Sequence, residues 1–149
     1  MININYNTKT AQAEDIYSHL KECNNNFIPP LDEKVNILNY SKKLYEKAIT
    51  FEAWDEKILI GLIATYLNDA GNKMAFITNV STIKAYMGKG IANELMKMCI
   101  SYSKSHNFNE INLEVSSKNT DALNLYKKYG FVKNKEEDSI TFMRLILNK

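Results

Sequence analysis

The segment that most constrains the fold of this chain is a helical pattern enclosed by two strand patterns. Residues 74–82 hold apolar and β-branched side chains next to a turn, and residues 111–115 alternate apolar and polar ones, so both predict strands. Between them, apolar residues recur every three or four positions over residues 88–105, which predicts an amphipathic helix. A strand-helix-strand unit pairs its strands in parallel, so the sequence predicts a local parallel pair.

The other patterns surround this unit with strands and helices in the order βαα βββ αβαββ. Turn-forming residues separate three consecutive strands before the helix, which indicates an antiparallel meander. We therefore expect an α/β fold of the α+β kind, with helices packed on a mixed sheet, in one domain over residues 1–149. The predicted strands lie at 2–6, 49–54, 58–67, 74–82, 111–115, 131–132 and 139–147, and the predicted helices at 11–22, 31–47, 88–105 and 119–129.

Composition excludes several classes of protein. A chain of 149 residues with 45% hydrophobic and 24% charged residues has the balance of a globular domain. The net charge of +2 is too small for a general field that attracts nucleic acid or acidic membranes. The first residues lack a signal sequence, and the longest apolar run, residues 58–64, is too short to cross a membrane. We expect a cytoplasmic protein that binds neither nucleic acid nor membrane.

The cysteine and histidine residues form no metal-ligand pattern. Cys23 and Cys99 are too few for a disulfide framework and show no paired CxxC spacing, so we expect reduced thiols and no metal. Cys99 falls on the apolar stripe of the helix at 88–105, which favours a core thiol over a nucleophile. His19 and His106 are expected at helix ends or on the surface, with no catalytic triad.

Two glycines bracket a lysine where the strand at 74–82 leads into the helix at 88–105. The stretch reads Met87, Gly88, Lys89, Gly90, Ile91 and Ala92. A helix N-terminus offers unpaired N–H groups and the positive end of the helix dipole, and glycine lets an anion approach that backbone. The loop therefore predicts a phosphate site, while a tight strand-to-helix turn without a ligand is the alternative. It is neither a Walker loop nor GxGxxG, because Asn93 occupies the third glycine position.

A second group of residues follows about twenty-five positions later. It reads Leu-Glu-Val-Ser at 113–116, then Asn119, Ala122, Leu-Tyr at 125–126 and Gly-Phe at 130–131. Together with the glycine loop, this block resembles the GNAT superfamily of acyl-CoA-dependent N-acyltransferases, whose members show a Q/R-x-x-G-x-G/A loop and an LEV…N…A…LY…GF block. The resemblance covers about residues 74–132, and residues 1–73 match only in their pattern of elements.

The resemblance implies a fold and a cosubstrate. The fold has about seven mainly antiparallel strands, a splayed parallel pair formed by the fourth and fifth strands, and four helices. The cosubstrate is acetyl-CoA, whose pantetheine arm would contact Asn119 and the backbone of Val80, the latter also facing the thioester oxygen. Its pyrophosphate would bind the backbone of Met87, Gly88, Lys89, Gly90, Ile91 and Ala92. Met87 departs from the Gln or Arg usual in the family, so no side-chain contact is expected there.

Two residues are implied as catalytic. Tyr126 lies seven positions after Asn119, two turns along one helical face, so both can face one ligand. The resemblance makes Tyr126 the acid that protonates the departing thiolate, and makes Glu114 a candidate base for the attacking amine. A core tyrosine and a structural strand residue are the alternatives. Other candidate bases are Glu52, Asp69, Tyr66 and Thr78.

The expected function is therefore N-acetyl transfer from acetyl-CoA to an amine by direct attack in a ternary complex. The alternatives are a non-catalytic acyl-CoA-binding or regulatory module and a structural domain whose glycine loop is only a turn. The acceptor is a small-molecule or peptide amine, and the resemblance places its site at about residues 23–38 and 67–72. The sequence leaves the oligomeric state open, a homodimer included.

Overall fold

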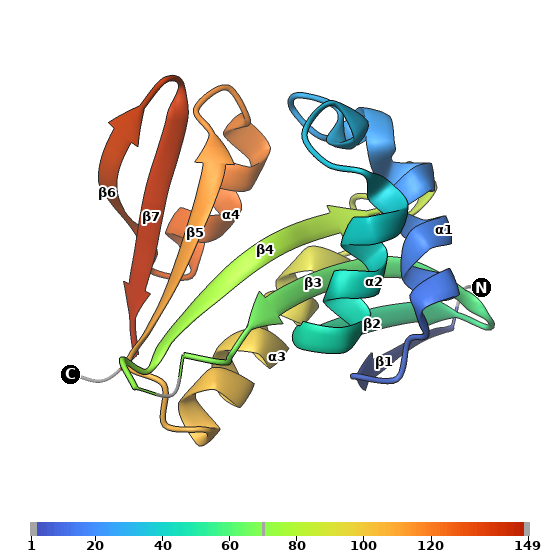
Figure 1. Ribbon diagram of the computed structural model, residues 1–149, viewed down its shortest axis with the longest axis horizontal. Coiled ribbons are helices and arrows are strands. Elements are labelled where there is room, and N and C mark those ends of the chain that lie inside the picture. Colours follow the sequence, from blue (N-terminus) through green and yellow to red (C-terminus); the bar gives the residue numbers. More distant parts are fainter. Residues whose placement is uncertain (1–2, 70, 148–149) are drawn as a thin grey trace.

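The computed structural model describes residues 3–69 and 71–147, which form a seven-stranded sheet with helices on both faces (Figure 1). The strand order is β1-β2-β3-β4-β5-β7-β6, and all neighbours are antiparallel except the parallel pair β4 and β5. This mixed α/β sheet confirms the predicted fold class. The bounds are β1 Ile4–Thr8, α1 Ala13–Cys23, α2 Ile37–Lys47, β2 Ile49–Asp55, β3 Ile58–Tyr66, β4 Met74–Thr82, α3 Ile91–Ser105, β5 Glu110–Ser116, α4 Thr120–Lys128, β6 Val132–Glu137 and β7 Ile140–Ile146.

Each face of the sheet has its own hydrophobic core. Helices α1 and α2 cover one face, where Ile16, Leu20 and Leu44 pack with apolar residues of β3. Helices α3 and α4 cover the other face, where Leu95 and Tyr126 belong to the larger core (Figure 1). Burial of these two apolar faces is the main force that holds the helices on the sheet.

The second helix begins later than the sequence predicts. Residues Leu31–Glu33 form a single 3-10 turn, and α2 starts only at Ile37. Asn36 caps this start, because its side-chain oxygen accepts a hydrogen bond of 2.9 Å from the backbone N–H of Asn39. The predicted single helix over residues 31–47 is therefore wrong in its first six residues, where a cap interrupts the periodic apolar pattern.

The buried face of α2 also differs from the predicted one. Apolar periodicity counted from Leu31 over residues 31–47 places Leu38 and Tyr45 on the core-facing stripe, but they are 46% and 40% exposed. Ser41 and Leu44 are buried instead, and the Ser41 hydroxyl donates to the carbonyl of Ile37 at 2.8 Å, which satisfies this polar group inside the core. The expected stripe was counted from Leu31, which lies outside the helix.

The two ends of the chain also differ from their predicted strands. The described part of the first strand begins at Ile4, and Ile2, which the prediction included, lies outside the described residues. Strand β6 runs over Val132–Glu137, whereas only residues 131–132 were predicted. Every residue of β6 is exposed, so an edge strand of this kind has no alternation of buried and exposed side chains for the sequence to reveal.

The parallel pair separates halfway along its length. The pairing of β4 with β5 runs from Met74 opposite Glu110 to Ile77 opposite Leu113 and then stops. On its other side β4 carries a β-bulge at Thr78, because its neighbours Ile77 and Asn79 oppose consecutive residues of β3. A bulge bends its strand, and Figure 1 shows β4 diverging from β5 toward the end where the connection between α1 and α2 lies.

Helix α3 packs closely on the sheet at Gly61 of β3. A Cβ at this position would lie 2.6 Å from Ile91 Cγ2 and 3.3 Å from Ala53 Cβ and Leu95 Cδ1. We expect Gly61→Ala to lower the free energy of unfolding by about 1–3 kcal/mol, measured by urea denaturation, because overpacking displaces the start of α3. Gly71→Ala is the matched control, since a Cβ there meets nothing within 4 Å. Equal stability of the two variants would contradict this packing.

Candidate active site

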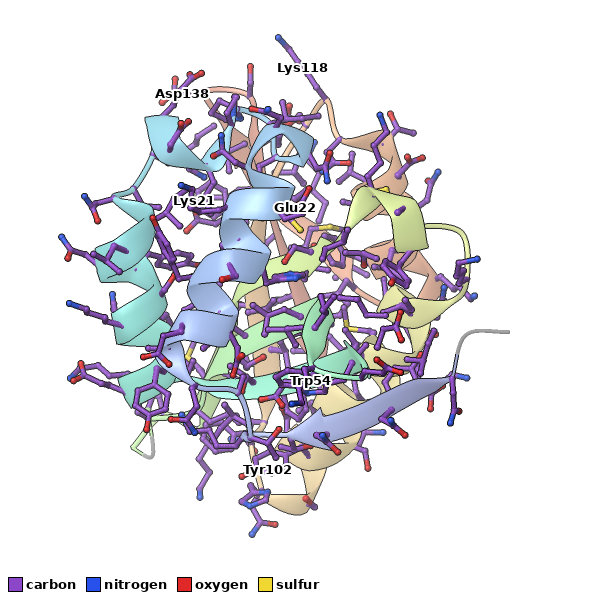
Figure 2. All side chains as sticks on the ribbon, turned by 90° about the vertical axis from the view of Figure 1, so that its right-hand side faces the viewer. Lys21, Glu22, Trp54, Tyr102, Lys118 and Asp138 are labelled. Carbon is purple, nitrogen blue, oxygen red and sulfur yellow. The ribbon has the colours of Figure 1, made fainter. Side chains whose placement is uncertain are left out.

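A cleft of about 520 Å³ lies where β4 and β5 diverge. Four parts of the chain line it: the connection after α1, the second half of β4, the start of α3, and the segment from β5 into α4. Figure 2 shows the molecule from the side of α1. In this view Glu22 of α1 lies in the same half of the molecule as Lys118 and Asp138, and Trp54 and Tyr102 lie in the opposite half. The lining residues are Asn26 to Pro29, Leu31, Lys34, Thr78 to Thr82, Tyr86 to Gly88, Gly90 to Asn93, Glu114 to Ser116, Asn119, Asp121, Ala122, Leu125 and Tyr126.

The start of α3 forms one wall of the cleft and leaves its backbone accessible. Gly88 and Gly90 have φ values of +80° and +79°, a left-handed conformation that side chains other than glycine adopt at a cost. Gly90 is the N-cap and makes no side-chain cap, so the first N–H groups of the helix have no side-chain partner. A Cβ on either glycine would meet nothing within 4 Å, so both face open space. This wall has the geometry of an anion site.

The residues around these glycines differ in whether they line the cleft. Met87, Ile91 and Ala92 line the cleft as the sequence predicts, and Met87 is 49% exposed. Lys89 is exposed and does not line the cleft, so it is the one predicted binding residue among the described positions that lies outside it. A lysine side chain is long and rotates freely, so Lys89 is a mobile charge between the two glycines that line the cleft.

The bulge in β4 is held by a tyrosine from α2. The Tyr40 hydroxyl donates to the backbone carbonyl of Thr78 at 3.0 Å and lies 2.8 Å from the Thr78 side-chain oxygen. Since a bulged residue loses its regular ladder hydrogen bonds, this contact provides the partner that the carbonyl needs. Burial raises the pKa of Tyr40 to about 12, so its hydroxyl keeps the proton it donates.

Helix α4 positions its site residues through both of its ends. Asn119 is the N-cap, and its side-chain oxygen accepts a hydrogen bond of 3.2 Å from the N–H of Ala122. Gly130, with φ +97°, ends the helix: its N–H donates to the Lys127 carbonyl at 3.0 Å, and the Phe131 N–H donates to the Tyr126 carbonyl at 3.0 Å. This is a Schellman motif, as the glycine stop in the sequence predicts.

Tyr126 is a buried residue that lines the cleft. It is 5% exposed, its ring centroid is 5.8 Å from that of Phe131, and within the described residues its hydroxyl makes no hydrogen bond. Burial raises the pKa of Tyr126 above that of an ordinary phenol, because the anion would lose its hydration. The side chain is therefore a neutral phenol that keeps its proton around neutral pH.

Among the candidate bases, only two line the cleft. Glu114 is exposed on β5 and faces the cleft. Thr78 also lines it, but its hydroxyl contacts Tyr40. Glu52 is fully buried, and its carboxylate accepts hydrogen bonds from the Thr10 and Ala11 backbone, the Thr10 and Thr50 hydroxyls and the Trp54 indole, so it is a structural anchor for the start of α1. Asp69 and Tyr66 do not line the cleft.

The structure corrects two further expectations. His19 is 2% exposed and lies in the interior, not at a surface, because it occupies the same face of α1 as Ile16 and Leu20. That i, i+3 spacing from Ile16 was present in the sequence and could have predicted its burial. The residues described within 67–72 do not line the cleft, so only the connection after α1 remains from the expected acceptor region.

Three further observations on the described residues concern the cysteines, possible metal ligands and possible membrane-spanning helices. Cys23 and Cys99 are free and buried, and burial raises their pKa values to about 12 and about 11. No group of three or more His, Cys, Asp or Glu side chains is placed to hold a metal ion within residues 3–69 and 71–147. In the same part of the chain, no helix combines the length and the apolar character that crossing a membrane requires.

One family model and two curated relatives match this chain in sequence. Residues 13–131 match the model of the acetyltransferase (GNAT) family. The chain is 31% identical over 86 residues to the streptothricin acetyltransferase of Escherichia coli, covering 58% of this chain and 48% of that protein. It is 30% identical over 107 residues to the N-alpha-acetyltransferase MAK3 of Arabidopsis thaliana, covering 70% of this chain and 56% of that protein. The chain thus spans about half the length of these relatives.

Solved structures show the same fold. The crystal structure of PH1933 from Pyrococcus horikoshii OT3 superposes with a TM-score of 0.82 at 23% identity, covering 99% of this chain and 100% of that chain. The PaiA N-acetyltransferase of Thermoplasma acidophilum in complex with coenzyme A gives a TM-score of 0.77 at 16% identity, covering 97% of this chain and 99% of that chain. These two likenesses show the fold of the chain. The chain belongs to the GNAT family of acetyltransferases.

The contact of Tyr40 with the bulge can be tested by removing one oxygen. We expect Tyr40→Phe to lower the free energy of unfolding by about 1–3 kcal/mol, measured by chemical denaturation, because the Thr78 carbonyl loses its donor. Tyr45→Phe on the same helix is the matched control: Tyr45 is 40% exposed, so its hydroxyl is accessible to water. A loss of the same size in both variants would show that the bulge does not depend on Tyr40.

Proposed function

We propose that this protein transfers an acetyl group from acetyl-CoA to the amine of a small-molecule or peptide acceptor, by direct attack within a ternary complex. The observation that carries the proposal is the cleft, which contains both the start of α3, opened by two glycines, and Tyr126, whose hydroxyl has no hydrogen-bond partner among the described residues. Membership in an acetyltransferase family supports the reaction, and both relatives named above are acetyltransferases.

The residues present fit the anionic part of coenzyme A. A Cβ on Gly88 or Gly90 would meet nothing within 4 Å, and the N–H groups at the start of α3 have no side-chain cap. The backbone of Met87, Gly88, Lys89, Gly90, Ile91 and Ala92 would hold the pyrophosphate. The exposed Lys89 would add a positive charge between the two glycines.

The amide groups of the pantetheine arm need hydrogen-bonding partners, and β4 offers them. Beyond Ile77, β4 has lost its partner strand on the β5 side, so peptide groups there face the cleft. The backbone of Val80 would pair with the arm as a strand does and would stabilise the thioester oxygen. Asn119 lies across the cleft at the start of α4, with one lone pair of its side-chain oxygen used by the cap.

Acetyl-CoA supplies an acetyl group activated as a thioester, and the chain supplies the proton transfers. As the amine nitrogen bonds to the carbonyl carbon and the carbon–sulfur bond breaks, Tyr126 would give its proton to the sulfur. Glu114 would accept the proton that the amine loses, directly or through water, since its carboxylate lines the cleft and is exposed. Positioning of the two substrates would contribute most of the rate.

Blocking the start of α3 tests where the cosubstrate binds. We expect acetyl-CoA to raise the melting temperature of the natural protein, because a ligand that binds only the native state stabilises it. Gly90→Trp should weaken coenzyme A binding at least about tenfold, measured by calorimetry, because the indole would fill the open space at the helix start. Gly71→Trp, in a distant turn, should bind normally. Full affinity in Gly90→Trp would exclude this wall as the binding site.

Removal of the Tyr126 hydroxyl tests its role as the acid. We expect Tyr126→Phe to lower kcat by about 10²-fold or more while the KM for acetyl-CoA stays within about twofold, measured by release of the coenzyme A thiol with a panel of primary amines. Tyr17→Phe on α1 is the control, since Tyr17 does not line the cleft. Unchanged kcat in Tyr126→Phe would remove the acid from the mechanism, and binding without any thiol release would favour a non-catalytic module.

A further inference from the structure

The connection from β4 to α3 is attached to the body of the fold at both of its ends. At its beginning, the Ile83 N–H donates to the carbonyl of Ile60 on β3 at 2.9 Å, and a single 3-10 turn, Lys84–Tyr86, follows. At its other end, Ile91 is 2% exposed and belongs to the core on the α3 face. Residues 87–90 are all exposed, so this glycine segment lies between two fixed points.

Tyr86 makes the last side-chain hydrogen bond before the glycine segment. Its hydroxyl donates to Asp55 Oδ2 at 2.5 Å, and Asp55 is the final residue of β2. A hydrogen bond of this length from a hydroxyl to a carboxylate is charge-assisted and stronger than one between neutral groups. The same bond raises the pKa of Tyr86, so the phenol keeps the proton that it donates. Tyr86 therefore ties the connection to a strand that is not its sequence neighbour.

The two partners lie differently with respect to the cleft. Tyr86 lines it, whereas Asp55 does not, so the hydroxyl of Tyr86 is held by a residue outside the cleft. With its proton engaged by a carboxylate, this phenol has no proton to give to a substrate. An effect of Tyr86 on a bound ligand is then exerted through the backbone that follows it.

That backbone needs to be held because it is rich in glycine. Gly88 and Gly90 are in the left-handed region, and glycine loses more conformational freedom on ordering than any other residue. Without the contact to Asp55, the segment that has no side-chain attachment would grow from residues 87–90 to residues 84–90, and a single 3-10 turn has weak hydrogen bonds of its own. Ordering this longer segment around a ligand would cost affinity.

We propose that Tyr86 and Asp55 are a positioning pair for the cosubstrate: their hydrogen bond holds the backbone of residues 87–90 in the conformation that binds the pyrophosphate of coenzyme A. This inference rests on the proposed acetyl transfer and gives neither residue a proton-transfer step. Because the pair acts on the segment that would hold the pyrophosphate, its effect is limited to ligands that carry this group.

Removal of one oxygen from Tyr86 tests the pair. We expect Tyr86→Phe, which keeps the ring, to raise the Kd for coenzyme A about tenfold, measured by calorimetry. Asp55→Leu should do the same, whereas Asp55→Asn keeps an oxygen that accepts and should restore most of the affinity. The Tyr86→Phe, Asp55→Leu double variant should bind no more weakly than either single variant, because both lose the same contact. Tyr102→Phe, in the last turns of α3 and outside the cleft, is the matched control.

A pair of thioesters separates positioning from a general loss of structure. With the best acceptor among tyramine, spermidine and a tetrapeptide with a free N-terminus, Tyr86→Phe should lower kcat/KM for acetyl-CoA about tenfold. For S-acetylpantetheine, which has no pyrophosphate, kcat/KM should stay within about twofold of the natural protein's value. Partial unfolding would lower both values equally. In the ligand-free variant, NMR order parameters of the Gly88 and Gly90 amides should fall, because the segment is less ordered.

The outcomes distinguish this inference from the function on which it rests. If the natural protein binds coenzyme A but Tyr86→Phe binds it equally well, loses equally with both thioesters, or leaves the order parameters of the two glycines unchanged, the positioning pair is overturned and the proposed function stands. If the natural protein does not bind coenzyme A at all, the proposed function is overturned and the positioning pair with it.

Discussion

The separation of β4 from β5 is the constraint on which the rest of this structure depends. Strands β4 and β5 pair in parallel over Met74 to Ile77, and continued pairing would leave no gap between them. The bulge at Thr78 bends β4 away from β5 instead. Tyr40 supplies the hydrogen bond that the bulged backbone loses, so the opening is built into the fold. Buried peptide groups need partners, and the half of β4 that faces the opening is therefore suited to a ligand that brings amide groups of its own.

Much of the fold could be predicted from the sequence because it follows from local patterns. The parallel pair follows from a helix between two strands. The start of α3 and the end of α4 follow from glycines at positive φ, and Gly130 forms a Schellman motif that includes the Tyr126 carbonyl. Prediction failed where a local signal was weak. The apolar pattern continued through Leu31 although the Asn36 cap interrupts the helix, and the exposed strand β6 has no alternation to detect.

The candidate site was predictable only in part, for a related reason. Residues at the start of α3 and on α4 are close in sequence and share motifs, and apart from Lys89 the structure brings them to one cleft. Tyr40 and Thr78 are 38 positions apart, and His19 and Ser81 are 62 apart, so only the packing of α1 and α2 on the sheet brings these pairs together. Periodicity could have shown that His19 is buried, but not which strand residue it meets.

Burial acts in opposite directions on two titratable side chains, Tyr126 in the cleft and His19 in the interior under α1. It raises the pKa of Tyr126, which keeps its proton, and lowers the pKa of His19, which gains none. Neither group therefore changes charge around neutral pH, and the Tyr126 hydroxyl keeps the role of a hydrogen-bond donor on the α4 side. In the proposed direct transfer the leaving sulfur gains a proton, and a phenol that stays protonated across this range could supply it. Between pH 6 and 9, the dependence of the reaction on pH should then follow the amine itself, since only its neutral form has a lone pair to attack.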